Sequence, residues 1–232
     1  MSSGADDAGL LEQLLARRHS CRAFQPHPVP PETIRRMLAI AQRTASWCNT
    51  QPWQVYVTQS AGTERVRAAL QAAARADGPD NNAGSDVPFP EAYSGERLAR
   101  RREAGFQLYG AVGVARGDPD GAARQALRNF DLFDAPHTAI VTAPRELGTY
   151  GAMDCAAWVS NCLLAAQALG LGAIAQAAVA RQSAVLRQEL GIPEDKVVLC
   201  GVSFGYADAG HSANSYRTSR EVIDAAVSWV SA

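Results

Sequence analysis

The residues best suited to chemistry form two arginine clusters, one near each end of the chain. The first reads RRHSCRAF and the second reads NSYRTSRE. Alternate residues of an extended segment point to the same side, so Arg18, Ser20 and Arg22 could line one wall. Guanidinium groups and a hydroxyl suit phosphate, because the planar fork matches two of its oxygens. Arg217 and Arg220 could complete such an anion site.

A solvated, arginine-rich surface is the alternative interpretation of the first cluster, and composition alone favours it. Its position argues for a site instead. Leu10, Leu14 and Leu15 precede it at helical spacing, and a second apolar helix is predicted after it. Charged groups packed between two apolar helices are costly unless they have a partner.

Several other chemistries lack their motifs. The chain contains no G-x-S-x-G, H-E-x-x-H or G-x-x-x-x-G-K-S/T sequence. The segment GLGAIA has Ala175 where a dinucleotide-binding loop has its third glycine, and it follows a predicted helix instead of a strand. The five cysteines and four histidines do not have the spacing of zinc ligands, so we expect no metal site.

The composition is typical of a single enzyme-sized domain spanning residues 1–232. The chain has 47% hydrophobic residues, 22 basic and 23 acidic side chains, and a formal net charge of -1. This balance provides no overall attraction to nucleic acid or to an anionic membrane. The N-terminus, MSSGADDAG, does not resemble a signal peptide, and the odd cysteine count suggests reduced thiols. We therefore expect a cytoplasmic protein.

Apolar periodicity predicts the elements that must position the arginines. Helices are predicted at residues 10–17, 31–45, 63–75, 96–115, 152–169 and 185–190. Strands are predicted at 53–59, 137–143, 172–179 and 196–207. The remaining segments are a Gly-, Pro- and Asn-rich loop at 77–95, a turn at 117–121 and an amphipathic tail at 219–230. Few strands among many helices indicate an α+β fold, with a small sheet between helices.

Two motifs together resemble the nitroreductase family of FMN-dependent oxidoreductases. R-x-S-x-R-x-F occurs at 18–24, and S-x-x-N-x-Q-P-W occurs at 46–53. The segment ALGLGA and the tail RTSRE…VSWV extend the likeness over almost the whole chain, in order. The resemblance implies a small mixed or antiparallel sheet and a domain-swapped homodimer with two FMN sites at the subunit interface.

The resemblance also implies roles for the arginine clusters. Arg18 and Ser20 would hold the FMN phosphate or ribityl chain, with His19 in the same wall. Arg217 and Arg220 would complete the phosphate pocket. Arg22 would lie near the N1/O2 edge of the flavin, where a positive charge stabilises the anionic reduced form.

Further FMN contacts are implied for two other segments. Ser46, Asn49 and Gln51 would reach the flavin of the other subunit, although ordinary loop capping is the alternative interpretation. The backbone N–H of Ala177 would lie near flavin N5. Gln176 in the same segment would also bind the cofactor; it departs from the pattern of many relatives, and we expect it to tune substrate contact.

The segment between the first strand and the second resembles the branch of nitrobenzoate and nitrobenzene reductases and iodotyrosine deiodinases. In that branch the segment forms a lid over the substrate. Glu91, Tyr93 and Arg97 are the lid candidates, and a plain surface loop is the alternative interpretation.

The resemblance implies an enzyme that takes hydride from NADH or NADPH and reduces nitroaromatic or related aromatic and quinone substrates. FMN N5 would carry the hydride in a ping-pong cycle, and no side chain would be catalytic in the strict sense. The alternatives are a reductive dehalogenase, an ene or quinone reductase, a flavin-storage protein, or an anion-binding domain without a cofactor.

Overall fold

The computed structural model describes residues 4–78 and 81–231. A four-stranded sheet in the order β1-β2-β4-β3 lies at the centre of the molecule, and every neighbouring pair of strands is antiparallel. The strands are β1 (Gln54–Thr58), β2 (His137–Pro144), β3 (Gly172–Gln176) and β4 (Lys196–Gly205). The predicted α+β class, with its small sheet and four strands, is confirmed.

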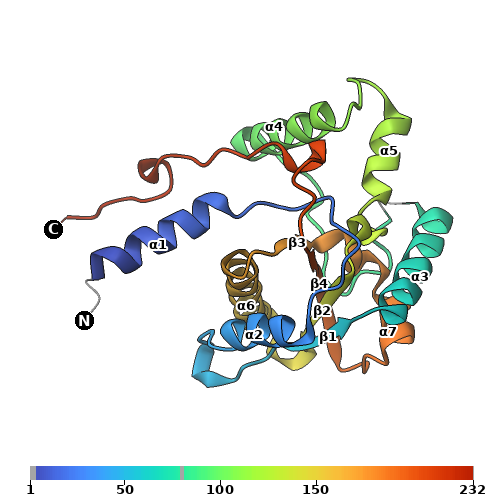
Figure 1. Cartoon of the computed structure of the whole chain (residues 1–232), viewed down its shortest axis with the longest axis horizontal. Helices are drawn as coiled ribbons and strands as arrows, with labels where there is room; N and C mark the ends of the chain where they lie inside the picture. Colours follow the sequence, from blue (N-terminus) through green and yellow to red (C-terminus); the bar gives the residue numbers. More distant parts are fainter. Residues whose placement is uncertain (1–3, 79–80, 232) are drawn as a thin grey trace.

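Helices cover both faces of this sheet (Figure 1). One face packs against α2 (Pro31–Ala41) and α6 (Gly148–Ala168), and the other against α3 (Ala61–Asp77) and α7 (Ser183–Leu190). Successive side chains of a strand point to opposite faces, so β2 contributes to both cores. Val141 packs with Trp158 on the first face, and Ile140 packs with Leu70 on the second.

Helix α6 is the longest helix, with 21 residues, and it lies against β2, β3 and β4. Cys155, Trp158 and Cys162 recur at helical spacing on its buried side. This apolar packing against the sheet explains its hydrophobic sequence. No helix within the described residues combines the length and hydropathy needed to span a bilayer.

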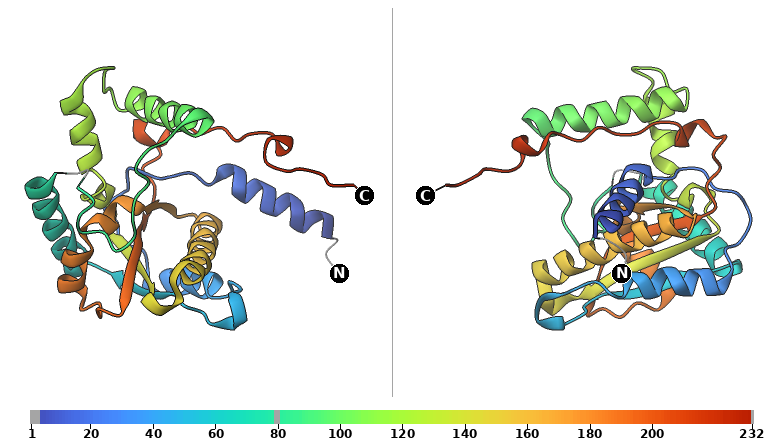
Figure 2. Two further views of the ribbon diagram at one scale, coloured as in Figure 1. Left: turned by 180° about the vertical axis from the view of Figure 1, so that it is seen from behind. Right: turned by 60° about the vertical axis from the view of Figure 1, so that its left-hand side comes forward.

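Both ends of the chain project from the same side of the molecule (Figures 1 and 2). Helix α1 (Gly4–Arg17) leaves Leu10, Leu11 and Leu15 about half exposed. The described part of the tail after β4 contains an isolated bridge at Ala207 and two short 3₁₀ turns, and Trp229 and Val230 are 75% and 95% exposed. These two arms therefore present apolar side chains that this chain does not cover.

The structure corrects several predicted boundaries. The predicted turn at 117–121 is the start of helix α5 (Pro119–Leu127), where Pro119 occupies the first turn and the Asp118 carboxylate accepts from the Gly121 N–H at 2.8 Å. Helix α2 stops at Ala41, before residue 45. Helix α4 (Gly95–Ala111) stops before residue 115. Strand β3 gives way after Gln176 to a 3₁₀ segment, Ala177–Gln182.

Candidate functional site

The first arginine cluster lies in an extended segment beside strand β3. Ser20 forms an isolated parallel bridge with Ala173, and the Cys21 N–H donates to the Ala173 carbonyl at 3.1 Å. Cys21 is completely buried, whereas the residues on either side of it are partly exposed. This alternation places Ser20 and Arg22 on the open side, as the i, i+2 spacing predicts.

The two arginine clusters meet in one pocket of about 240 Å³. The charged and polar residues lining it are Arg18, His19, Ser20, Arg22, Tyr216, Arg217, Thr218 and Arg220. Leu15 and Ala16 of α1 and Ala104 of α4 close its sides. The structure therefore brings together the residues that the sequence placed about 190 positions apart.

The pocket is positively charged and contains no acidic lining residue. Within residues 4–78 and 81–231, none of its four arginines pairs with a carboxylate. Burial lowers the pKa of Arg18, and the Arg220 guanidinium lowers that pKa further. Converging guanidinium groups without counter-charges repel one another, so this arrangement favours a bound anion.

His19 adds a buried nitrogen without a partner to this pocket. Its Nδ1 lies 3.3 Å from the Arg17 carbonyl, which can only accept, so Nδ1 carries the proton. Burial lowers the pKa of His19, and the nearby Arg217, Arg18 and Arg22 lower it further, so the ring is neutral near pH 7. Its Nε2 is buried and has no hydrogen-bond partner in the described chain. In this tautomer Nε2 is an acceptor that suits a ligand hydroxyl.

The second cluster fixes the position of Arg22, and it supplies residues that the sequence analysis did not single out. The Arg22 N–H donates to Asn214 Oδ1 at 2.7 Å, and Arg22 Nη1 donates to the Tyr216 hydroxyl at 2.8 Å. Thr218 Oγ1 accepts from Arg220 Nη1 at 2.9 Å. All three polar residues lie between or beside the arginines of NSYRTSRE, and this proximity is the only sequence signal that could have identified them.

Ser46, Asn49 and Gln51 lie away from this pocket, in the turn between α2 and β1. Ser46 Oγ accepts from the Gln51 N–H at 2.9 Å, and Gln51 Nε2 donates to Asn49 Oδ1 at 3.2 Å. Cys48, Asn49 and Gln51 all have positive φ angles, of 51°, 56° and 46°. Such backbone conformations cost energy, and they cluster at functional sites. One chain alone does not bring this turn to the arginine pocket.

The Gln176 side chain is buried, whereas the sequence analysis expected it to contact the cofactor or the substrate. It is 2% exposed; its Nε2 donates to the Asn129 carbonyl at 2.8 Å, and its Oε1 accepts from Ser203 Oγ at 2.5 Å. The β3 alternation explains the difference, because Ala175 and Ala177 face outward and Gln176 faces inward. Ala177, the residue directly after β3, is exposed.

The lid candidates Glu91, Tyr93 and Arg97 are exposed and line no part of the arginine pocket. The Tyr93 ring contacts the Arg101 guanidinium, 5.2 Å from the ring centroid. The loop before them is tied to the body of the protein, because the Asp86 carboxylate accepts from Arg187 Nη2 at 2.7 Å. The segment is therefore anchored at one side, and its role as a lid stays a prediction.

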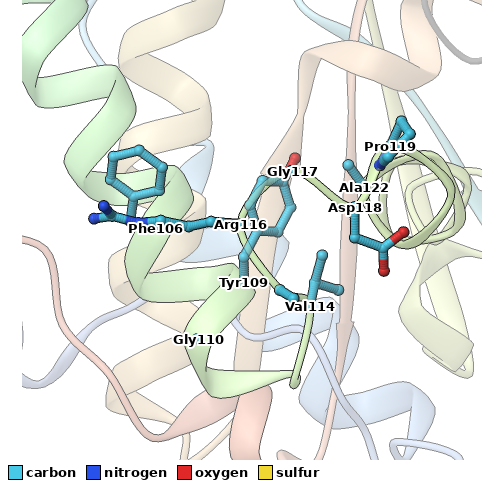
Figure 3. A pocket seen from close by; sticks show the side chains of 10 residues that line it. Phe106, Tyr109, Gly110, Val114, Arg116, Gly117, Asp118, Pro119 and Ala122 are labelled. Carbon is cyan, nitrogen blue, oxygen red and sulfur yellow. The ribbon is translucent and has the colours of Figure 1, made fainter.

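A larger and more apolar groove, of about 740 Å³, lies between the end of α4 and the start of α5. Figure 3 shows Phe106, Tyr109 and Val114 along it, with Arg116 beside Phe106. The Arg116 guanidinium stacks 4.4 Å from the Phe106 ring centroid. No residue of the arginine pocket lines this groove, so the two are separate cavities.

Comparison with known proteins agrees with the motifs and the fold. Residues 15–206 match the family model described as "Nitroreductase family". The chain is 33% identical to nitroreductase NfnB of Mycolicibacterium smegmatis over 93% of its own length and 90% of that protein. It is 34% identical to chloronitrobenzene nitroreductase of Comamonas testosteroni, over 92% and 94% of the two chains.

A solved structure matches equally well. The FMN-dependent nitroreductase NfnB from Mycobacterium smegmatis, in complex with NADPH, superimposes with a TM-score of 0.89 at 32% identity, covering 97% of this chain and 99% of that one. The two arginine clusters, the antiparallel sheet and these likenesses lead to the same conclusion: the chain belongs to the nitroreductase family.

Proposed function

We propose that this chain is an FMN-dependent oxidoreductase that uses NAD(P)H to reduce nitroaromatic compounds. The observation that carries the proposal is the pocket in which four guanidinium groups converge without a carboxylate partner among the residues that the structure describes. A phosphate ester is the ligand that such a pocket fits best. The names of the relatives, which include chloronitrobenzene and nitrobenzoate reductases, support the nitroaromatic substrate class.

Different residues of the pocket bind different parts of the cofactor. Arg18, Arg217 and Arg220 bind the phosphate, and Ser20 donates to it or to the ribityl chain. The neutral His19 accepts from a ribityl hydroxyl through Nε2, which has no partner in the described chain. Arg22 provides positive charge for the flavin edge that becomes anionic on reduction.

Bound FMN supplies the hydride chemistry, by which NAD(P)H and the nitro compound react in turn at N5 in a ping-pong cycle. The protein holds, shields and polarises the cofactor, and no side chain acts as nucleophile or base. Ala177 is exposed directly after β3, and its backbone N–H would be the donor to N5 of bound FMN. Glu91, Tyr93 and Arg97 lie on the exposed approach to α4 and cover the substrate as a lid.

We also propose that the active form is a homodimer with an FMN site at each interface. Ser46, Asn49 and Gln51 lie outside this chain's own pocket and contact the flavin of the partner subunit. Their strained turn and the uncovered apolar residues of α1 and the tail support this arrangement. The free thiols and the use of NAD(P)H fit the cytoplasm.

The proposal is tested by purifying the protein and recording its absorbance spectrum before and after anaerobic addition of NADPH. We expect a flavin spectrum that bleaches with NADPH and returns when 4-nitrobenzoate is added. Turnover of a quinone or a halophenol in place of the nitroarene would indicate quinone reductase or dehalogenase activity. A flavin that NAD(P)H does not bleach would indicate a storage protein, and a protein that binds no FMN would refute the family-based function altogether.

Arg18→Ala provides the test of the pocket itself. A charge-assisted hydrogen bond is worth about 1.5–3 kcal/mol, so its loss raises the Kd for FMN by about 10- to 150-fold. Arg75→Ala is the matched control, because Arg75 lies exposed at the end of α3 and outside the pocket. Equal FMN affinity in the two variants would show that Arg18 does not bind the cofactor.

A further inference from the structure

Hydrogen bonds to neutral groups hold Arg22, a partly buried arginine, in place. Its backbone N–H donates to Asn214 Oδ1, and its Nη1 donates to the Tyr216 hydroxyl at 2.8 Å and to the Ser20 carbonyl at 3.3 Å. Asn214 is itself fixed, because its Nδ2 donates to the carbonyls of Ala23 and Asp208. The chain therefore determines where this guanidinium lies before any ligand binds.

The acceptors that hold Arg22 are all uncharged. A carboxylate would satisfy the same N–H groups but would cancel most of the charge. Burial raises the pKa of Tyr216, and the attraction of Arg22 offsets this only in part, so the phenol stays neutral at physiological pH. Arg22 itself remains charged, because an arginine does not lose its proton in a protein. The hydrogen bond thus orients a positive charge without neutralising it.

Arg22 and Tyr216 both line the arginine pocket, so the oriented charge borders the space that a ligand would fill. The Arg22 guanidinium carbon lies 5.9 Å from the centroid of the Tyr216 ring, which places the ring beside the charge as well as the hydroxyl. A partly buried, uncompensated charge interacts more strongly with a nearby anion than an exposed charge does.

We propose that Tyr216 is a positioning residue that holds the Arg22 guanidinium at the pocket without neutralising its charge, so that the site binds reduced FMN more tightly than oxidised FMN. The proposal rests on the FMN function proposed above. Tyr216 does not itself touch the reacting atoms, and it acts through Arg22. Removing its hydroxyl should therefore change the ratio of the two FMN affinities more than it changes oxidised FMN binding.

The test uses Tyr216→Phe, with Tyr109→Phe as the matched control. Tyr109 lines the separate α4–α5 groove, and the Arg22 guanidinium hydrogen-bonds to Ser20 and Tyr216. For each protein the Kd of oxidised FMN is measured by fluorescence quenching, and the midpoint potential of bound FMN is measured by dye titration. In Tyr216→Phe we expect a Kd for oxidised FMN within about threefold of that of the parent protein. We expect the midpoint potential of bound FMN to be lower by about 30 mV, which for a two-electron couple equals a tenfold change in the ratio of the affinities for reduced and oxidised FMN.

A double-mutant cycle separates positioning from general disruption. If Tyr216 acts through Arg22, Tyr216→Phe should produce no further potential shift in an Arg22→Gln background. An unchanged potential in the single Tyr216→Phe variant, or a shift of equal size in the Arg22→Gln background, would overturn the inference while leaving the proposed function intact. A parent protein that binds no FMN would overturn both.

Discussion

Replacement of Asp86 by alanine gives a sharp test of how the long loop before α4 is held. The Asp86 carboxylate accepts from Arg187 Nη2 and from the Val198 N–H, each at 2.7 Å. The Asp86 side chain is only 15% exposed and the Arg187 side chain only 10%. Arg187 Nη1 is buried and has no partner within the described residues, and loss of the Asp86 carboxylate leaves Arg187 only the exposed Glu194 as a counter-charge, with Glu194 Oε2 3.4 Å from Arg187 Nε. Removing one partner of a buried ion pair costs about 3–5 kcal/mol.

The assay is urea unfolding at fixed protein concentration and with FMN in constant excess, because both affect apparent stability. With a slope of about 3 kcal/mol per M, the expected midpoint shift is about 1 to 1.7 M. Glu96→Ala is the control: its pair with Arg100 is exposed and is worth at most about 0.5 kcal/mol. Amide exchange at Val198 should also accelerate in Asp86→Ala. A midpoint as little changed as that of Glu96→Ala would refute the anchoring role.

Three further predictions follow from the buried polar groups. Burial lowers the pKa of His137, whose Nε2 accepts from the Val29 N–H. As the pH falls, the unfolded chain therefore binds the proton before the folded chain does, and the free energy of unfolding should decrease below about pH 6.5. Equal urea midpoints at pH 7.5 and 5.5 would contradict this prediction. Gln176→Leu should lower stability by about 1–3 kcal/mol because Ser203 loses its partner, with no change in FMN affinity, measured by urea unfolding and flavin titration. Burial raises the thiol pKa to about 12 for Cys155, Cys162 and Cys200. Mass spectrometry should therefore find these three cysteines unlabelled after iodoacetamide treatment of the native protein at pH 8.

The family and the framework of the fold could be predicted from the sequence because their signals are local. Strand β4 is a continuous apolar run, and α6 is a long apolar helix, so period and length identify both. The extended geometry at Ser20 and Arg22 also follows from simple alternation. These features depend little on distant parts of the chain.

Features that depend on distant contacts could not be predicted in this way. Gln176 faces inward because β3 pairs with β4, where Ser203 receives it, and no local pattern reports that pairing. Asp86 looks like an ordinary loop residue until Arg187 is brought beside it. Helix α5 was the exception, since Asp118 and Pro119 form a recognisable helix start that the glycines around them obscured.

The FMN roles of the pocket residues stay predictions, and one measurement tests them most directly. We propose that guanidinium groups from both ends of the chain bind the phosphate ester of the cofactor. The Kd values of the purified protein for FMN and for riboflavin, which lacks only the phosphate, should then differ by about 100-fold or more, as the loss of two or more charge-assisted contacts requires. Equal affinity for the two flavins would contradict the account.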